Sequence, residues 1–323
     1  MNMKTISLIV FGFLFVSCGN AEFQFDAHTG TDGLMVEFQQ NAPPDEFYTT
    51  ATGEPLEIAM QVANRGAFDV STAFLSLATE RDYVIIDGWD QRSPITILGS
   101  NQERIAFPMK GKSLSDPFGT DEVFTTYTTA KINDPQVETL PTQVLAAVCY
   151  PYRTELHTPV CIDTDPNNLQ NRRKSCGISS LSFSGQGAPV AVTAIEERIL
   201  PSGTEFVRPQ FIITIENVGG GTVLSADPDL LSQACSDASI NANRFNTVKL
   251  SEVSLSGFSL SAEQFDCQPV TIQLLEGTAE VTCTLKPGLL KSAQDTYSTD
   301  LAVTLDYGYM TTAAAAFRLT RST

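Results

Sequence analysis

The residues best able to do chemistry in this chain are carboxylates. The 323 residues include 37 Asp and Glu but only 2 His. Nucleophilic triads need a histidine base, and we expect both His28, near the start of the chain, and His157, in a predicted hairpin tip, to be exposed polar residues. Paired carboxylates that hydrolyse glycosidic bonds are an enzyme alternative, because 37 acids form many pairs, although no pair stands out.

A second candidate is a relaxed phosphate-loop pattern, A-x-x-x-x-G-K-S, at residues 106–113 (AFPMKGKS). A working phosphate loop needs a strand before it and a helix after it, so that backbone N–H groups meet the phosphates. Residues 114–119 (LSDPFG) form a turn sequence instead. We therefore predict a hairpin tip here and no bound nucleotide.

A third candidate, residues 163–167 (DTDPN), places oxygen-bearing side chains at alternate positions, as a Ca²⁺ loop does. The sixth position is Asn168 rather than Gly, and the twelfth is Lys174 rather than Glu. We predict a polar turn, and we expect no metal or other cofactor.

The single tryptophan, Trp89, lies between charged residues in DGWDQR, residues 87–92. A tryptophan in a loop is a candidate binding anchor. The alternative is that Trp89 folds back onto the edge of a sheet.

The chain contains seven cysteines, and an exported protein with paired cysteines favours disulfides. If Cys18 is modified, an even six remain, three in each half of the chain. One bridge then crosses between the halves, or each half keeps a free thiol. Spacing favours Cys149 with Cys161 and Cys267 with Cys283, each pair flanking a predicted hairpin. The six disulfide candidates are Cys149, Cys161, Cys176, Cys235, Cys267 and Cys283.

The N-terminus has the composition of an export signal. Lys4 precedes a short apolar run over residues 5–16, which is shorter than the roughly 20 residues of a membrane span. Residues 15–19 (FVSCG) resemble a lipobox, although Phe15 stands where that family has Leu, Val or Ile. We predict a signal peptide over 1–17, lipid attachment to the membrane at Cys18 and a tether over 18–33. Secretion with cleavage nearby, or an uncleaved anchor, is the alternative.

Composition excludes several functional classes. Hydrophobic residues make up 42% and charged residues 18%, and the net charge is −17. A chain this acidic is repelled by phosphate backbones, so nucleic-acid binding is not expected. The length suits about two domains of roughly 150 residues.

The elements that must position these residues are strands. Apolar and polar residues alternate at residues 57–62, 210–216, 247–255, 270–274 and 279–285. Alternation of period two, bounded by Gly, Pro, Asn and Asp, is typical of half-buried antiparallel strands. One short helix is predicted at residues 227–235, where Asp227 caps and Pro228 begins the first turn. The predicted class is all-β with this one inserted helix.

Two motifs recur in the same order. Residues 60–66 (MQVANRG) and 213–219 (ITIENVG) share apolar-x-apolar-x-Asn-x-Gly, and residues 144–152 (VLAAVCYPY) and 301–309 (LAVTLDYGY) both end in Tyr-x-Tyr. Pro151 and Gly308 look like breakers, so return strands are expected at 159–163 and 315–320. The repetition predicts two copies of one fold, over residues 34–163 and 190–323, joined by a polar linker over 164–189.

These motifs resemble exported immunoglobulin-like sandwiches, especially the CARDB-like domains of prokaryotic surface proteins. The resemblance covers residues 34–163 and 190–321 and implies surface display, spacing or adhesion, with no catalytic residues. The resulting prediction is two tandem immunoglobulin-like β-sandwiches in a non-enzymatic protein, tethered to the cell envelope, facing outward and bound to protein partners or to itself. A subunit that self-assembles by β-strand addition, using a first strand within residues 20–45, is one alternative, and an extracytoplasmic carboxylate hydrolase is another.

Overall fold

The computed structural model describes residues 26–90, 95–98, 103–169, 171–235, 241–256, 264–292 and 295–322. Strands dominate these residues, with one α-helix, α1 (Pro228–Ala234), and one 3₁₀ turn, η1 (Ala242–Arg244). The predicted signal peptide and Cys18 lie outside the described residues. Among the helices within them, none is long and apolar enough to cross a membrane.

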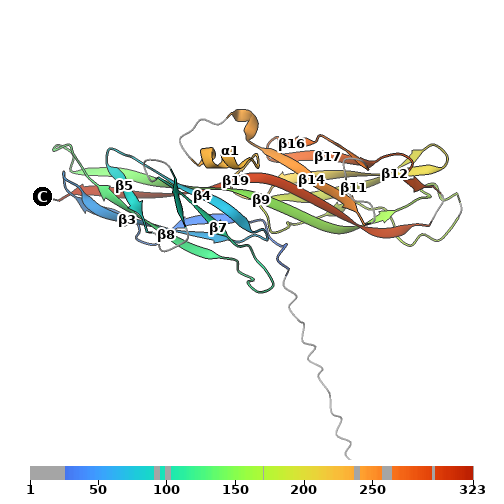
Figure 1. The fold of residues 1–323 in the computed structure, drawn as a ribbon, viewed down its shortest axis with the longest axis horizontal. Coiled ribbons are helices and arrows are strands. Elements are labelled where there is room, and N and C mark those ends of the chain that lie inside the picture. The colour runs from blue at the N-terminus through green and yellow to red at the C-terminus, as the bar shows by residue number, and fades with distance from the viewer. Residues whose placement is uncertain are drawn as a thin grey trace, which may run out of the picture.

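Three sheets make two lobes, which lie end to end in Figure 1. The first lobe contains a four-stranded sheet in the order β1 (Leu34–Phe38), β3 (Glu54–Asn64), β8 (Asp121–Ala130), β5 (Val84–Trp89). The second lobe contains a sheet in the order β10 (Leu181–Ser182), β11 (Val190–Ser202), β12 (Phe206–Asn217), β17 (Thr278–Leu285), β15 (Phe265–Gln268), with β18 (Leu290–Lys291) paired to β12.

The third sheet runs through both lobes. Its order is β16 (Thr271–Gln273), β14 (Thr247–Leu255), β19 (Tyr297–Arg321), β9 (Thr139–Ile162), β4 (Val70–Thr79), β7 (Arg104–Met109), β6 (Thr96–Leu98). Two short strands, β13 (Thr222–Leu224) and β2 (Glu46–Thr49), also pair with β19. All described pairings are antiparallel except β2 with β19.

The long strands β9 and β19 join the lobes. They pair without a break from Ile162 opposite Tyr297 to Thr139 opposite Thr320, so each strand contributes one half to each lobe (Figure 1). One hydrophobic core cluster accordingly extends through both lobes. The two lobes are therefore physically interlaced along this ribbon.

The predicted breaks within these strands are wrong, as are the separate return strands at 159–163 and 315–320. Pro151 lies opposite Gly308 within the ladder. The N–H of Cys161 points away from β19, and Pro151 has the same parity along β9, so its missing N–H removes no bond to β19. Gly308 lies within the strand, and a Cβ there would be 2.5 Å from a methyl carbon of Leu231, which explains why glycine stands at this position.

The other strand and helix predictions are confirmed. The alternating segments form β3, β12, β14, β16 and β17, and the buried positions of β12 alternate along its length. Helix α1 begins after Asp227, whose side chain accepts from the N–H of Asp229, and Pro228 occupies the first turn. The helix lies on β9 in Figure 1, where the main-chain oxygen of Ser232 accepts a 2.7 Å bond from Arg104.

Three disulfides connect the six described cysteines. The pairs are Cys149–Cys235, Cys161–Cys176 and Cys267–Cys283. The expected Cys267–Cys283 pair is present between β15 and β17. The expected Cys149–Cys161 pair is wrong, because both residues lie on β9, and twelve residues of extended strand separate them by about 40 Å.

The bridge between Cys149 and Cys235 crosses from one half of the chain to the other. Both residues are buried, and the bond fixes the end of α1 to β9. Three disulfides indicate that the protein folds in an oxidising compartment, outside the reducing cytosol.

Candidate functional site

Four buried tyrosines mark the junction of the lobes. Tyr150 lies opposite Tyr309, and Tyr152 lies opposite Tyr307 in the β9–β19 ladder. Each is at most 2% exposed, and the ring centroids of the opposed pairs are 6.0 and 6.3 Å apart. We call these four residues the tyrosine cluster.

In the first lobe, the tyrosine cluster contacts the Asn-x-Gly turn that follows β3. The Tyr152 hydroxyl donates to Oδ1 of Asn64 at 3.3 Å and accepts from the N–H of Phe68 at 3.3 Å. The Asn64 amide donates to the oxygen of Phe68 at 2.9 Å. A Cβ on Gly66 would lie 1.9 Å from the Tyr152 hydroxyl oxygen, which explains why glycine stands there.

The second lobe repeats this arrangement. The Tyr309 hydroxyl donates to Oδ1 of Asn217 at 2.9 Å and accepts from the N–H of Gly221 at 2.8 Å. A Cβ on Gly219 would lie 2.4 Å from the Tyr309 hydroxyl oxygen. The two motifs that recur in the sequence are thus bonded to each other in each copy.

The remaining two tyrosines fix the beginnings of β1 and β11. The Tyr150 hydroxyl accepts from the N–H of Leu34 at 2.9 Å, and the Tyr307 hydroxyl accepts from the N–H of Val190 at 3.3 Å. Burial raises the pKa of Tyr150 and of Tyr307 well above the usual range. These hydroxyls therefore stay neutral and act as structural hydrogen-bonding groups.

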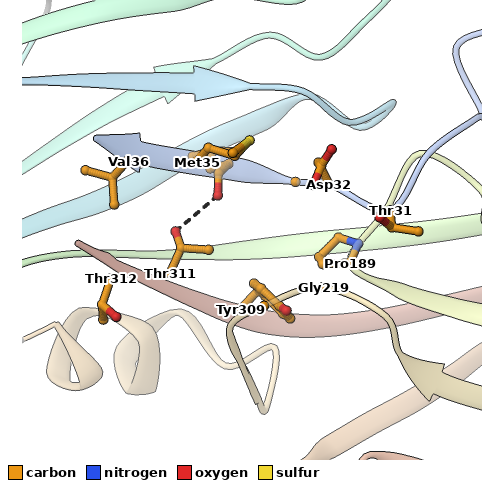
Figure 2. Close-up of a pocket in the computed structure, with 12 residues that line it drawn as sticks. Thr31, Asp32, Met35, Val36, Pro189, Gly219, Tyr309, Thr311 and Thr312 are labelled. Atoms are coloured by element: carbon orange, nitrogen blue, oxygen red, sulfur yellow. Dashed lines mark hydrogen bonds between the residues drawn. The ribbon is translucent and has the colours of Figure 1, made fainter. Parts of the chain in front are cut away.

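A pocket of about 220 Å³ opens beside the tyrosine cluster, between β1 and β19. Figure 2 shows Thr311 of β19 facing β1, where its hydroxyl donates to the oxygen of Leu34 at 3.1 Å. Asp32 supplies the carboxylate of the lining, which otherwise consists largely of hydroxyl, backbone and aliphatic groups. Such a lining suits the binding of a side chain or a short peptide segment.

Next to this pocket, β19 has an open edge. On the side away from β9, β13 pairs with β19 up to Met310, and β2 pairs with it from Arg318 onward. Within the part of the chain that the structure describes, no strand pairs with the intervening residues 311–317 on that side. We call residues 311–317 the open edge.

The register shows which backbone groups the open edge presents. The N–H of Arg318 points away from β9, since it donates to the oxygen of Asp45. Alternate residues of a strand point the same way. The N–H and C=O groups of Thr312, Ala314 and Ala316 therefore point outward.

The corresponding stretch of β9 in the second lobe is different. Pro151 of β9 lies opposite Gly308 of β19, so we number equivalent positions from these two residues. Thr312, Ala314 and Ala316 lie four, six and eight residues after Gly308, and Glu155, His157 and Pro159 lie at the same distances after Pro151. We call this stretch, residues 153–161, the closed edge. It ends at Cys161, whose N–H is occupied by the Glu197 carboxylate at 3.2 Å.

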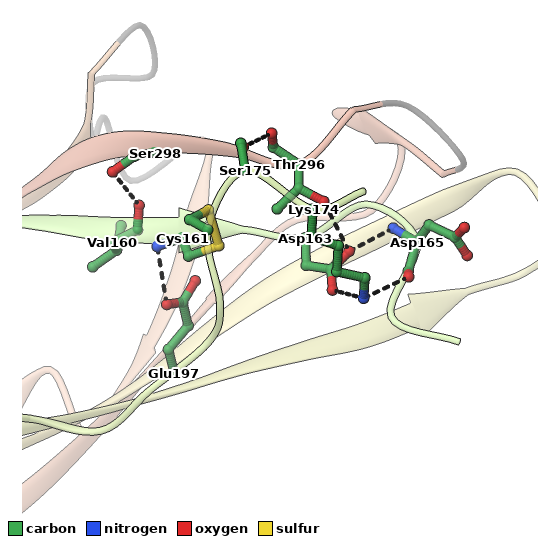
Figure 3. Close-up of a disulfide and its surroundings, with 10 residues drawn as sticks. Val160, Cys161, Asp163, Asp165, Lys174, Ser175, Glu197, Thr296 and Ser298 are labelled. Atoms are coloured by element: carbon green, nitrogen blue, oxygen red, sulfur yellow. Dashed lines mark hydrogen bonds and ion pairs between the residues drawn. A yellow bond between two sulfur atoms is a disulfide. The ribbon is translucent and has the colours of Figure 1, made fainter. Parts of the chain in front are cut away.

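Figure 3 shows Glu197 beneath the Cys161–Cys176 disulfide. Its side chain is 5% exposed, and Oε1 has no hydrogen-bond partner within the described structure. Burial raises the pKa of Glu197 to about 7; the hydrogen bond from Cys161 opposes this increase, and the charge of Asp163 adds to it. Glu197 is thus the carboxyl group here whose charge changes near neutral pH.

The Ca²⁺-like segment forms a polar turn. The Asp163 carboxylate accepts from the N–H of Asp165 at 3.0 Å and forms an ion pair with the Lys174 ammonium, which also donates to the oxygen of Asp165 at 3.1 Å (Figure 3). A lysine side chain thus supplies the positive charge. Across the described ranges, no cluster of three or more His, Cys, Asp and Glu side chains suits a metal ion.

The phosphate-loop pattern has neither the expected hairpin nor a following helix. It begins in β7, and the chain then crosses to β8 in another sheet, so the predicted hairpin tip is wrong. The N–H of Gly111 donates to the Asp69 carboxylate at 2.8 Å, and that of Lys112 donates to the oxygen of Gly66 at 2.8 Å. Both N–H groups are therefore bonded within the protein.

Trp89 ends β5 and is 6% exposed, within the core of the first lobe. A ring in this position stabilises the packing and presents little surface to a partner.

The open edge was not predicted from the sequence. The available signal was the uncharged run at residues 311–316 (TTAAAA), compared with Glu155, His157 and Pro159 at equivalent distances from the Tyr-x-Tyr motif. That signal has meaning only when both stretches are known to be strands of one ladder.

Comparison with known proteins assigns no family: no family model matches the chain, and no curated protein matches it. Among solved structures, a chain of a type I cohesin–dockerin complex from Clostridium thermocellum is 17% identical, with 38% of this chain and 85% of that one covered, at a TM-score of 0.23. The C-terminal domain of the Streptococcus agalactiae antigen I/II polypeptide BspA is 7% identical over 90% of this chain and all of that one, at a TM-score of 0.17. The C-terminal domain of the Streptococcus pyogenes antigen I/II-family protein AspA is 6% identical over the same shares, also at 0.17. Scores this low carry no argument about fold or function.

Proposed function

We propose that this protein is a non-enzymatic binding, adhesion or structural module of the cell envelope, held by a lipid on Cys18 and facing outward. Its two lobes are immunoglobulin-like β-sandwiches, built from repeats over residues 34–163 and 190–323 that are joined by 164–189 and that each extend one long strand into both lobes. The main support is the junction itself. An unbroken ribbon of two long strands, four buried tyrosines and a crossing disulfide hold both lobes in line, and an accessible strand edge and pocket lie beside them.

The geometry gives the carboxylate hydrolase alternative no support. Glu197 has the raised pKa that a general acid needs, and Asp163 is the neighbouring carboxylate. Both are 5% exposed, and Glu197 lies beneath a disulfide, so neither carboxyl group is open to a glycosidic oxygen. A binding surface fits the accessible groups better than a catalytic centre.

Two measurements test the proposal. Intact mass of the mature protein is expected to show an acylated N-terminal Cys18, and an unmodified N-terminus elsewhere contradicts the lipid tether. Cross-linking on intact cells, followed by identification of the attached proteins, is expected to recover envelope or extracellular partners or further copies of this chain. Recovery of the chain only in the cytosol, with reduced cysteines, contradicts the envelope assignment.

A further inference from the structure

We propose that the open edge of β19 receives an extended strand from a second copy of this protein, namely its residues 20–26. This inference rests on the proposed envelope location and names the partner.

The open edge accepts one strand and not another sheet. Seven residues, 311–317, lie between the last β13 pair at Met310 and the first β2 pair at Arg318. At about 3.3 Å per residue the gap is about 23 Å long. The same edge of a second copy would bring its own β13 and β2, which would collide with the β2 and β13 already present. A single extended segment avoids that collision.

The chemistry of the open edge favours strand addition. Thr312, Ala314 and Ala316 carry no charge and expose their side chains to solvent. Unpaired N–H and C=O groups along such an edge are a template for another strand. The protein otherwise has a net charge of −17, which opposes contact between copies, so an uncharged stretch is a favourable place for them to meet.

The interior side of the open edge leaves room for large side chains. Ala313 and Ala315 face the same side as the buried Phe317 and are themselves half-buried. Their methyl groups leave space that an added strand can fill, because neighbouring strands place side chains on the same face. The pocket shown in Figure 2 lies at the Thr311 end of the edge and can take one further ring.

Residues 20–26 (NAEFQFD) have the matching pattern. Ala21, Phe23 and Phe25 alternate with polar residues, as a strand with one buried face requires. The segment is seven residues long, which equals the gap. The sequence predicted a donor strand within residues 20–45; in that span, residues 34–38 form β1, which is already paired with β3 and cannot serve as the donor.

The path of the chain assigns the donor to a second copy. From β1 the described chain runs back along the end of β3, where Gly33 accepts from Arg65 at 2.9 Å and Gly30 accepts from Gly187 at 2.8 Å. Asp26 therefore joins the lobe on the β3 side of β1, whereas the open edge lies on the other side. Each copy would give one segment and receive one, a head-to-tail contact that extends into rows of copies.

The test replaces Phe23 with a photo-cross-linking residue in the full chain. Equal amounts of ¹⁴N and ¹⁵N protein are mixed before irradiation, and the products are mapped by mass spectrometry. We expect mixed-isotope dimers linked between position 23 and residues 311–317. Links within one isotope only would show that the segment folds onto its own chain, and links elsewhere or none at all would also overturn the proposal.

A matched pair of variants isolates the edge. Ala316→Pro removes an outward N–H without touching the ladder to β9, and we expect it to reduce the mixed cross-link at least tenfold. Ala316→Ser keeps the N–H and is expected to retain the cross-link. Equal cross-linking in both variants, with unchanged melting temperatures, would overturn the proposal. The Cys18 mass and the surface exposure of both variants report on the envelope function separately, so a failed cross-link leaves that function independently tested.

Discussion

The open edge of β19 and the closed edge of β9 occupy equivalent places in the two lobes, yet their side chains are opposite in character. Thr312, Ala314 and Ala316 have uncharged side chains, and each has a backbone N–H that points outward. At the equivalent places β9 carries Glu155, His157 and Pro159, and a proline has no N–H to offer an added strand. The two lobes thus differ in that one edge is protected and the other is open to an added strand.

The strongest way to break this comparison is to disturb the junction that aligns both edges. Gly66→Ala would place a Cβ 1.9 Å from the Tyr152 hydroxyl oxygen and 2.4 Å from the oxygen of Asp32. We expect the free energy of unfolding to fall by about 3 kcal/mol or more, measured by urea denaturation. Gly220→Ala is the control, because its Cβ meets nothing within 4 Å and the loss should stay below about 1 kcal/mol. Equal losses would show that the Asn-x-Gly turn does not depend on the tyrosine.

The same junction shows how far sequence reasoning reaches. Alternation predicted the strands because that signal is local along the chain, and the repeated motifs led to the prediction of two copies of one fold. The continuity of β9 and β19 was missed because Pro151 and Gly308 act as breakers in most strands. In this register the proline nitrogen points away from β19. The register depends on the pairing of residues more than 150 positions apart along the chain, so local sequence patterns do not reveal it. The open edge was missed for the same reason, since it depends on where β13 and β2 join β19.

The closed edge can be probed through Glu197, which occupies the N–H of Cys161. Its folded pKa of about 7 lies above the ordinary value of 4.5. The proton therefore binds the folded state more tightly, and this stabilisation is complete below pH 4.5 and lost as the pH rises through 7. We expect the free energy of unfolding to fall by up to about 3 kcal/mol across this window.

Glu197→Gln removes that titration and keeps an oxygen that can accept from Cys161. The variant should be more stable than the parent at pH 9, and its stability should vary less between pH 5 and 9. The exposed neighbour Glu196→Gln is the control and should keep the parent's pH dependence. A parent whose stability is constant over this window contradicts the assignment.

A smaller effect compares the two tyrosine–asparagine contacts. Tyr309→Phe would leave the N–H of Gly221 and Oδ1 of Asn217 unpaired, and we expect a loss of about 1–2 kcal/mol in chemical denaturation. Tyr152→Phe should cost less, because its bonds to Phe68 and Asn64 are longer, at 3.3 Å. The exposed Tyr127→Phe should be nearly neutral. The reverse order of the two buried tyrosines would show that the lobes are not held in equivalent ways.

The smallest expected change in stability gives the sharpest comparison of the edges. Replacing Glu155 with Thr, His157 with Ala and Pro159 with Ala transfers the open-edge residues to β9. Because the backbone N–H groups of these positions point away from β19, the free energy of unfolding should change by no more than about 0.5 kcal/mol. If side chains alone close this edge, photo-cross-linking from position 23 should now reach residues 153–161 as well as 311–317. If it still reaches only 311–317, side-chain identity is insufficient, and the flanking strands β13 and β2 define the acceptor site. The single variant Pro159→Ala, with Glu155 and His157 retained, then separates the missing N–H from charge as the cause of closure.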